Sequence, residues 1–315
     1  MYEIRNAVEA DYEAIAVIGT LTRPEPFTAA EVLQQDRRAQ ADKEVAFQRL
    51  VAADPTGRIV GYGFVERSNW EPEGRWSVYA CSHPDVRCQG VGQALLTAVE
   101  RIALEAGATE LMAWCRGTDD NSLAWAERRG YVMNRQRTES VLDLTTFDPS
   151  RFAGHVDRVR ESGITLALYE GTQVPEPLVR GIYELDRATS RDVPAWDAGD
   201  TFPTYEQYHK DWMEHPDPYC TALALDGEQV VGISSIYFSP TPGKSGMVGY
   251  TAVLREYRGR GIALAVKLLA TEEAMRRGAP RLRTNNDPDN PPMLAINVKM
   301  GFQFIPGPRR LVKQV

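Results

Sequence analysis

The sequence has few of the residues that cross-linked, metal-binding and membrane proteins depend on. Its four cysteines and four histidines, among 315 residues, show neither the density of a disulfide framework nor the spacing of metal ligands. No apolar run approaches the roughly 20 residues that cross a bilayer, and the N-terminus lacks a signal-peptide pattern. We therefore expect a cytoplasmic protein that has no metal and no membrane partner.

Positive charge is also in short supply, since 36 lysines and arginines face 43 aspartates and glutamates, a net charge of -7. A protein that binds nucleic acid over a broad surface carries the opposite balance, so no nucleic-acid partner is expected. The acidic balance is compatible with a cationic or amine substrate. A length of 315 residues and a hydrophobic content of 43% allow two domains, each with its own core.

What the chain does contain, twice, is a basic turn with spaced glycines between an apolar strand and a helix. In the second copy the strand Met247–Val253 runs into Arg258-Gly259-Arg260-Gly261, and an apolar helical pattern follows. One shift in numbering superimposes the copies, pairing Gly61 with Gly232, Tyr79 with Tyr250, Arg87 with Arg258, Gly90 with Gly261, Gly107 with Gly278, Gly130 with Gly301 and Tyr131 with Phe302. So many coincidences at one shift indicate an internal duplication. We place the domains at 1–150 and 151–315, with a polar linker that begins at Asp148.

Each turn is suited to holding a phosphate group. Glycine lets the backbone approach an anion closely, and unpaired N–H groups at the start of the helix point toward it. The N–H groups of residues 89–92 and 260–263 are the candidates, and arginines beside them add positive charge. A glycine-containing turn between a strand and a helix is also an ordinary structural feature. A nucleotide site of the P-loop type is disfavoured, because neither turn ends in Gly-Lys followed by Ser or Thr.

These turns carry a family resemblance. The stretch from Arg87 to Gly92 reads R-x-x-G-x-G, that from Arg258 to Ala263 reads R-x-x-G-x-A, and each half has a closing helix that ends in Gly-Tyr or Gly-Phe. Both halves thereby resemble the GNAT superfamily of acyl-CoA-dependent N-acyltransferases, in a tandem arrangement like that of bacterial mycothiol-synthase-like proteins. The resemblance implies an α+β fold of two tandem domains, each with a mixed, mostly antiparallel sheet flanked by helices.

The resemblance also implies that acetyl-CoA is the cosubstrate and that its pyrophosphate lies on the turns. The expected contacts are Ser82, Arg87, Cys88, Gln89, Gly90, Val91 and Gly92 in the first half, and Ala252, Val253, Arg258, Gly259, Arg260, Gly261, Ile262, Ala263 and Asn290 in the second. Backbone groups at the strand ends are expected to pair with the pantetheine arm, as a strand pairs with an open edge. Asn290 is equally suited to capping the helix that follows it.

Many members of this family carry a tyrosine, four residues before the closing glycine, that protonates the leaving thiolate. This chain has Ala126 and Asn297 at those positions, and an amide can only hydrogen-bond to the thiolate. Tyr79 and Tyr250 lie at equivalent places on the strands that precede the turns, either beside the thioester or packed in the core. The candidates for catalysis are therefore Tyr250, Asn297 and Tyr79. Neither strand offers a carboxylate as a general base.

The acceptor side is expected to include a loop with acidic and aromatic residues. Asp192 and Trp196 in this loop suit an ammonium group, although a solvated loop would have the same composition. The resulting hypothesis is transfer of an acetyl group to a primary amine by direct attack in a ternary complex, with the second half the active one. The alternative is a non-catalytic acyl-CoA-binding or regulatory protein. The expected partner is a small-molecule amine whose identity, like the oligomeric state, the sequence leaves open.

Overall fold

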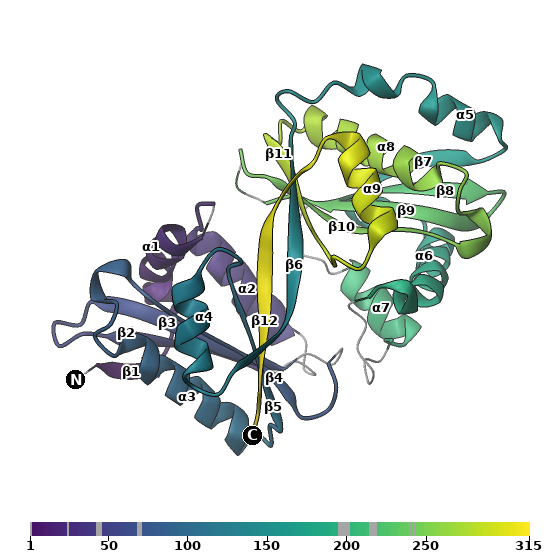
Figure 1. Ribbon diagram of the computed structural model, residues 1–315. Helices are drawn as coiled ribbons and strands as arrows, with labels where there is room; N and C mark the ends of the chain where they lie inside the picture. Colours follow the sequence, from purple (N-terminus) through teal and green to yellow (C-terminus); the bar gives the residue numbers. More distant parts are fainter. Residues whose placement is uncertain are drawn as a thin grey trace. The chain divides into compact units, whose positions relative to one another are not determined.

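The computed structural model describes residues 2–23, 25–41, 46–67, 71–194, 202–213, 219–239, 241 and 243–315. These residues form two compact units, and each unit has one sheet with helices packed on it (Figure 1). Unit 1 holds the described residues up to Arg135 together with Pro308–Val315, and unit 2 holds those in Gln136–Ala198 and Phe202–Gly307. In none of the described ranges is a helix long and apolar enough to cross a bilayer.

Unit 1 has the strand order β1-β2-β3-β4-β5-β12. Its elements are β1 (Glu3–Asn6), α1 (Tyr12–Thr22), α2 (Ala29–Ala41), β2 (Ala46–Ala53), β3 (Ile59–Arg67), β4 (Arg75–Ser82), α3 (Val91–Glu105), β5 (Glu110–Cys115), α4 (Asp120–Glu127) and the end of β12 (Gln303–Gln314). Neighbouring strands pair antiparallel except β4 and β5, which are parallel because α3 connects them as a crossover. The sheet is mixed and mostly antiparallel, as expected.

Unit 2 repeats this plan with the strand order β6-β11-β10-β9-β8-β7. Its elements are β6 (Val132–Asp143), α5 (His155–Glu161), β7 (Thr165–Glu170), α6 (Glu176–Thr189), α7 (Tyr205–Met213), β8 (Tyr219–Asp226), β9 (Gln229–Tyr237), β10 (Gly246–Val253), α8 (Ile262–Arg276), β11 (Arg281–Asn286) and α9 (Pro291–Met300). The parallel pair is β10 and β11, with α8 as the crossover. The duplication seen in the sequence is thus a duplication of the fold.

The closing strands of the two halves are exchanged between the units. Residues 309–314 of β12 pair with β5 in unit 1, and Leu311 is buried in the core of that unit. Residues 138–143 of β6 pair with β11 in unit 2, and Leu142 is buried there. The expected boundary at residue 150 describes the sequence repeat, whereas each compact unit takes its last strand from the other repeat.

The stretch after Asp148, predicted to be a linker, belongs to the folded part of unit 2. It contains α5, whose Val159 is buried in the core beside α8. His155 at the start of α5 reaches the second glycine turn, where its Nε2 lies 3.0 Å from the carbonyl oxygen of Gly261. The helix is short and otherwise polar, so its narrow apolar stripe gave no clear periodic signal.

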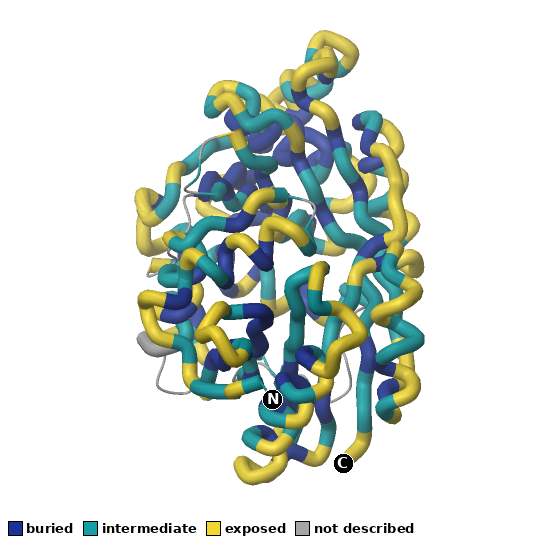
Figure 2. Tube along the Cα trace, turned by 90° about the vertical axis from the view of Figure 1, so that its left-hand side faces the viewer, coloured by how far each residue is buried: buried dark blue, intermediate teal, exposed yellow. Residues whose placement is uncertain are grey.

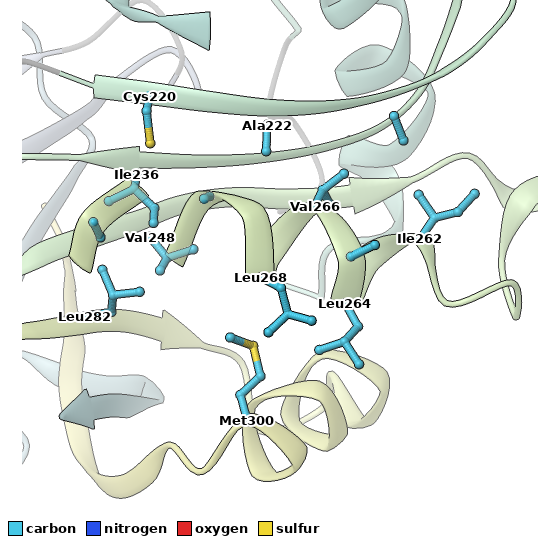
Figure 3. Packing of buried hydrophobic residues seen from close by; sticks show 14 of the residues in the cluster. Cys220, Ala222, Ile236, Val248, Ile262, Leu264, Val266, Leu268, Leu282 and Met300 are labelled. Carbon is cyan, nitrogen blue, oxygen red and sulfur yellow. The ribbon is translucent and has the colours of Figure 1, made fainter. Parts of the chain in front are cut away.

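Unit 2 has a separate apolar layer on each face of its sheet. Consecutive residues of β8 alternate between them, so Ala222 packs with α8 and Leu223 packs with α6 and α7. Helix α8 is apolar on most of its surface and lies between the sheet and α9, with Val266 and Leu268 buried (Figure 3). Buried residues in both units lie along the strands and the inner sides of the helices (Figure 2). The glycine turn therefore opens a helix on one face, while α6 and α7 cover the other.

Candidate active site

The second glycine turn opens α8 with a row of unpaired backbone N–H groups. Gly259 and Gly261 have positive φ angles of 79° and 82°, and Gly261 immediately precedes the first helical turn. The first helical hydrogen bond runs from Ala265 N to Gly261 O at 3.1 Å. Among the described residues, the N–H groups of 259–264 have no protein acceptor. A set of donors at a helix N-terminus is suited to an anion such as a pyrophosphate.

The first turn has the same backbone shape. Gly90 precedes α3 with a φ of 89°, and Cys88, the equivalent of Gly259, has a φ of 62°. Cys88 is the one non-glycine residue with a positive φ in the described ranges, and a side chain in that region is strained. The N–H groups of 90–93 also lack a protein acceptor within those ranges. Both turns therefore have the geometry of an anion site, and the first keeps it despite a cysteine.

Beside each turn the two parallel strands separate. β10 pairs with β11 only through Gly246 and Met247, and β4 pairs with β5 only through residues 75–77. The ends of β10 and β4, which hold Ala252–Val253 and Ser82, are paired by β9 and β3 on one side. Their other side is unpaired by any described strand. An open strand edge next to an anion site is suited to an extended ligand that carries amide groups.

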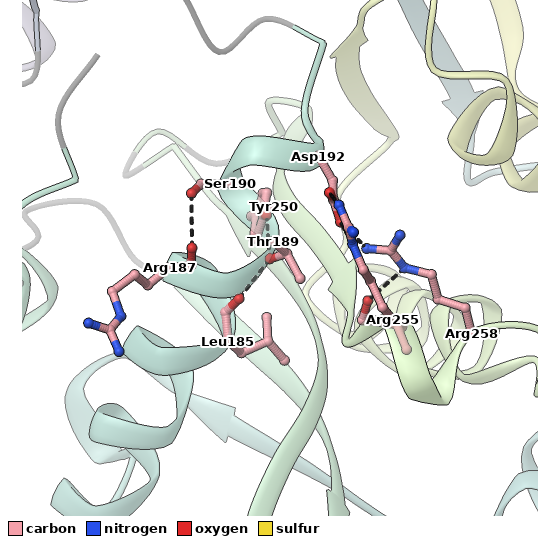
Figure 4. A network of polar contacts seen from close by, with 9 residues as sticks. Leu185, Arg187, Thr189, Ser190, Asp192, Tyr250, Arg255 and Arg258 are labelled. Atoms are coloured by element: carbon pink, nitrogen blue, oxygen red, sulfur yellow. Dashed lines mark hydrogen bonds and ion pairs between the residues drawn. The ribbon is translucent and has the colours of Figure 1, made fainter. Parts of the chain in front are cut away.

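Asp192 binds the arginines of the second turn (Figure 4). Arg255 and Arg258 both donate to its carboxylate, and Arg258 Nε also donates to Val253 O at 3.1 Å. Hydrogen bonds from Arg255, and then from Arg258, lower the pKa of Asp192 to about 2. An acceptor ammonium group would therefore compete with two guanidinium groups for this carboxylate. Trp196, the other residue predicted to bind the acceptor, lies outside the described residues.

The other residues expected to contact acetyl-CoA lie on the turns and at the start of α9. Those on the turn surface are exposed: Arg87, Cys88, Gln89, Gly90, Gly259 and Arg260. Those in the first turns of α3 and α8 can offer only backbone N–H groups or pack beneath them: Val91, Gly92, Ile262 and Ala263. Asn290 caps α9, where its Oδ1 accepts a hydrogen bond from Met293 N at 3.3 Å. The described residues include no group of three His, Cys, Asp or Glu side chains placed to hold a metal.

Asn297 lies in a buried network with a lysine that the sequence analysis missed. Its side-chain oxygen accepts a hydrogen bond from Lys267 Nζ, and its Nδ2 donates to Asn286 Oδ1 at 2.7 Å and to Ser140 Oγ at 3.3 Å. Burial lowers the pKa of Lys267 to about 7. A hydrogen bond from Asn297 to a thiolate would require one of its partners to move. The signal available in the sequence was a lysine in the middle of an apolar helix.

The two tyrosines considered for catalysis have different surroundings. The Tyr250 hydroxyl forms a 2.8 Å hydrogen bond with Thr189 Oγ1 on α6, and burial raises the pKa of Tyr250 (Figure 4). The Tyr79 ring lies 5.1 Å from Phe64 and 5.6 Å from Tyr62, between ring centroids. Unit 2 therefore places its phenol beside polar groups of α6, whereas unit 1 places the equivalent ring in an aromatic cluster.

Helix α6 supplies the carboxylate that the strands lack. Asp186 lies one helical turn before Thr189, its Oδ2 accepts a hydrogen bond from the Tyr208 hydroxyl, and its Oδ1 is buried without a partner. Burial raises the pKa of Asp186 to about 7, although the bond from Tyr208 opposes the shift. In unit 1 the helix on the corresponding face, α1, packs Ile15 and Ile18 against the sheet instead. Asp186 lies on an amphipathic helix, so no signal in the sequence distinguished it from a solvated aspartate.

Comparison with known proteins shows which family the chain matches. The sequence model of the acetyltransferase (GNAT) family matches residues 6–131 and, a second time, residues 181–302. Two curated relatives are both named mycothiol acetyltransferase. The one from Nocardiopsis dassonvillei is 25% identical over 274 residues, covering 78% of this chain and 76% of that protein. The one from Stackebrandtia nassauensis is 28% identical over 231 residues, covering 68% of this chain and 71% of that protein.

Solved structures have the same fold along the whole chain. A tandem GNAT protein from the clavulanic acid biosynthesis pathway gives a TM-score of 0.81 at 19% identity, covering 100% of this chain and 98% of that one. A GCN5-related N-acetyltransferase from Sphaerobacter thermophilus gives a TM-score of 0.72 at 23% identity, covering 99% and 95%. These matches confirm the tandem α+β fold that the sequence predicted. Because the family pattern recurs in both halves, the chain belongs to the acetyltransferase (GNAT) family, with its domain present in two tandem copies.

Proposed function

We propose that this protein is an acetyl-CoA-dependent N-acetyltransferase whose unit 2 transfers the acetyl group to a primary amine of a small molecule. One arrangement carries the proposal. It is supported by three features of the described residues near 250–261 in unit 2: a turn with positive-φ glycines before α8, an open strand edge, and a polar face with a carboxylate. Unit 1 has the turn and the open edge, but its corresponding face has an apolar cluster with Ile15 and Ile18, and the buried Asp36 carboxylate there is already paired with Arg49.

The residues of unit 2 fit acetyl-CoA as a substrate. The N–H groups of 259–264 would hold the pyrophosphate, and Arg260 on the turn surface adds positive charge. The open edge at Ala252–Val253 would pair with the pantetheine amides and place the thioester carbonyl against a strand N–H group. That donor stabilises the charge that develops on the carbonyl oxygen as the amine attacks.

The transfer proceeds by direct attack in a ternary complex. The amine nitrogen forms a bond with the carbonyl carbon, the carbon–sulfur bond breaks, and the sulfur leaves with the electron pair. A thiol has a pKa of about 8.5, so the thiolate leaves with little help from an acid. In this proposal Tyr250 is a hydrogen-bonding group near the reacting centre, and Asn297 joins it only after Nδ2 leaves Asn286 or Ser140. Holding the two reactants together supplies most of the rate.

Unit 1 is proposed to bind acetyl-CoA weakly or to serve as a scaffold, without an active Tyr79. The side of its sheet that corresponds to α6 and α7 already holds a cation, because the Arg23 guanidinium lies 4.1 Å from the Phe27 ring centroid and donates to the Tyr62 hydroxyl at 3.4 Å. A guanidinium group there repels the ammonium form of an acceptor. Ala126, at the position of the family's tyrosine, offers no proton.

The acceptor is proposed to be a small-molecule amine that reacts in the cytoplasm, with no role for nucleic acid or a membrane. The curated relatives are named mycothiol acetyltransferases, so the acceptor of those enzymes is the first compound to test. Identities of 25% and 28% support the choice of that compound for a screen. The acceptor of this chain has to come from the screen itself.

Acceptor-dependent release of the free thiol of CoA tests the proposal. The full chain is mixed with acetyl-CoA and a panel of primary amines, and the thiol is measured with a colorimetric reagent. We expect release that requires an amine, is lost in Gly259→Glu and is retained in Gly278→Glu. These two glycines are a matched pair, one before α8 and one after it, since both have a positive φ and open space where a Cβ atom would lie. Only Gly259 lies in the turn that is proposed to hold the pyrophosphate.

Two other results would contradict the proposal. Binding of acetyl-CoA without release of thiol, whichever amine is added, would favour the non-catalytic acyl-CoA-binding alternative. Release that survives in Gly259→Glu and is lost in Gly90→Glu would place the activity in unit 1. Gly107→Glu is the matched control for Gly90→Glu, because both positions flank α3 with a positive φ and open space.

A further inference from the structure

Four buried side-chain polar atoms in the described part of unit 2 have no hydrogen-bond partner. One is Asn285 Oδ1 on β11, and the other three are Asp186 Oδ1 on α6, Trp212 Nε1 on α7 and Thr221 Oγ1 on β8. Buried polar atoms in native proteins are nearly always paired, so unpaired ones point to a ligand or an ordered water. One of the three is an acceptor with a negative charge, one is a donor, and the hydroxyl is both.

The residues that carry the three atoms lie beside a cluster of aromatic side chains: Tyr208, Trp212 and Tyr219. The Tyr208 hydroxyl donates to Asp186 Oδ2, and the Tyr208 ring stacks on Trp212 with centroids 6.1 Å apart. Tyr219 meets Trp212 edge-on at 5.5 Å and donates from its hydroxyl to Trp212 O at 3.0 Å. Thr221 follows Tyr219 by two residues on β8, so both side chains lie on the same face of the sheet. The unpaired atoms therefore border one region between α6, α7 and the sheet.

This region adjoins the expected reacting centre. Thr189 lies one turn after Asp186 on α6 and bonds the Tyr250 hydroxyl at 2.8 Å. On the same face Tyr250 N donates to Ser235 Oγ at 3.1 Å. Ala252, two residues after Tyr250, lies on the open edge of β10 where the thioester is proposed to bind. A ligand that reached Asp186 from this side would have its reactive group near that thioester.

No described cation neutralises Asp186. Its neighbour Arg187 pairs with Glu184 at 2.6 Å, and the arginines of the turn bind Asp192. The titratable groups that face Asp186 or its partner from other elements are the phenols of Tyr208, Tyr237 and Tyr250. Burial without a countercharge raises the pKa of Asp186 to about 7. A bound cation would supply the missing countercharge, and aromatic rings beside it are favourable to an ammonium group.

We propose that this region is the acceptor site, in which Asp186 Oδ1 receives the ammonium group and Trp212 and Thr221 bind oxygen atoms of the same molecule. The acceptor class is thus a polar primary amine with hydroxyl or carbonyl oxygens close to the nitrogen, rather than a plain alkylamine. The inference rests on the proposed function and names the substrate class for the same site. It gives Asp186 the ammonium-binding role that the sequence suggested for Asp192.

Asp186 also accepts the proton that the amine has to lose. The ammonium group transfers one proton to the Asp186 carboxylate and becomes the free amine. Its nitrogen then bonds to the carbonyl carbon, the carbon–sulfur bond breaks, and the sulfur keeps the electron pair. The nitrogen then loses its second proton, which gives the neutral amide, and the thiolate takes up a proton to become the free thiol of CoA. Asp186 returns its proton to solvent when the product leaves.

The indole N–H signal of Trp212 tests this site without any acetyl-CoA. In nitrogen-resolved NMR of the full chain, Trp212→Phe identifies the signal. Three small probes are then compared: 2-amino-1,3-propanediol has both features, isopropylamine lacks the hydroxyl groups, and glycerol has a hydroxyl in place of the amine. We expect the amino diol to shift the signal at about pH 8 and to bind at least about tenfold more tightly than either control.

The variants separate recognition from folding. The shift is expected to disappear in Asp186→Asn, which keeps an acceptor for Tyr208, and to persist in Glu184→Gln, an exposed carboxylate on the same helix. It should also weaken at about pH 6, where Asp186 is protonated. Thr221→Val provides a second variant, expected to weaken the amino diol and leave isopropylamine unchanged.

Several results would overturn the inference. The first is no shift of the Trp212 signal with any probe, which would mean that ordered water pairs with the three atoms. The second is an equal shift with glycerol, and the third is an unchanged shift in Asp186→Asn. Failure of the proposed function looks different. The amino diol would still shift the Trp212 signal, while acetyl-CoA would fail to bind the wild-type chain by calorimetry.

Discussion

At the scale of single residues, the first glycine turn holds a strained cysteine. Cys88 has a φ of 62° where the second turn has Gly259. A side chain in the left-handed region costs about 1 kcal/mol relative to glycine. We therefore predict that Cys88→Gly raises the free energy of unfolding by up to about 1 kcal/mol, measured by urea denaturation. Cys88→Ala keeps the Cβ atom and should bring no such gain; a Gly variant less stable than wild type would contradict the assignment.

The charged form of Asp186 is predicted to destabilise the folded protein, because its place in the proposed acceptor site buries the carboxylate. Its pKa of about 7 in the folded protein exceeds the ordinary value of 3.8, so between these pH values the folded state holds a proton that the unfolded state lacks. Stability therefore falls as pH rises through this window, and the cost is complete above about pH 7. We predict that Asp186→Asn is more stable than wild type at about pH 8, on the order of 2 kcal/mol, because part of the aspartate side chain still meets solvent.

The same comparison at about pH 4 is the control, since the carboxyl group is then largely protonated in the folded protein. Urea denaturation at the two pH values should show the advantage of Asp186→Asn shrinking as the pH falls. An advantage that does not change with pH would mean that burying the charge of Asp186 does not destabilise the folded protein. Glu184→Gln, which changes an exposed carboxylate two residues earlier on α6, should show neither effect.

At the scale of elements, the packing of α8 against α9 depends on Lys267. Its pKa of about 7 in the folded protein lies below the ordinary value of 10.5. Between these values the unfolded state holds a proton that the folded state lacks, so stability rises as pH rises through this window. We predict that the stability of wild type relative to Lys267→Met improves between about pH 7 and pH 10. A difference that stays constant over this range, in urea denaturation, would show that the ammonium form is retained.

Local patterns predicted most of the elements. The strand expected over Met247–Val253 is observed as β10, and the glycine turns open α3 and α8 as expected, because strand periodicity and turn chemistry act over a few residues. The helix α5 and the full lengths of β6 and β12 were not predicted. Their partners lie in the other repeat or on α8, and a contact of that range leaves no periodic signal in the segment itself.

The residues of the candidate site also divide into those that a local motif predicts and those that depend on contacts distant in the sequence. The turn geometry at Gly259 and Gly261 follows from a local glycine motif, so it could be predicted from the sequence, and anion binding there stays a prediction. Asp186 could not be predicted, because an aspartate on an amphipathic helix looks solvated until α7 and the sheet enclose it. Asp192 was predicted to bind the ammonium group of the acceptor, and only the fold shows that two arginines bind this carboxylate.

At the scale of the whole molecule, each unit takes a strand from the other repeat, and this exchange can be tested with two matched substitutions. Leu311 is buried in unit 1 and Leu142 in unit 2, at 1% and 3% exposure. Each Leu→Ala change should cost about 2–5 kcal/mol. We predict that Leu311→Ala speeds hydrogen exchange in β2 and β3, whereas Leu142→Ala speeds it in β8 and β9. The opposite result, with faster hydrogen exchange in β8 and β9 for Leu311→Ala and in β2 and β3 for Leu142→Ala, would contradict the exchange of strands between the units.

The account as a whole depends on where acetyl-CoA binds. Calorimetry of acetyl-CoA binding to wild type, Gly259→Glu and its control Gly278→Glu tests this most directly, with Gly90→Glu and its control Gly107→Glu for unit 1. The account predicts that Gly259→Glu removes the tighter of the acetyl-CoA sites, because a carboxylate in the second glycine turn repels the pyrophosphate. It also predicts that the two controls bind acetyl-CoA as wild type does. Wild-type affinity in Gly259→Glu, or no binding to the wild-type chain, would contradict it.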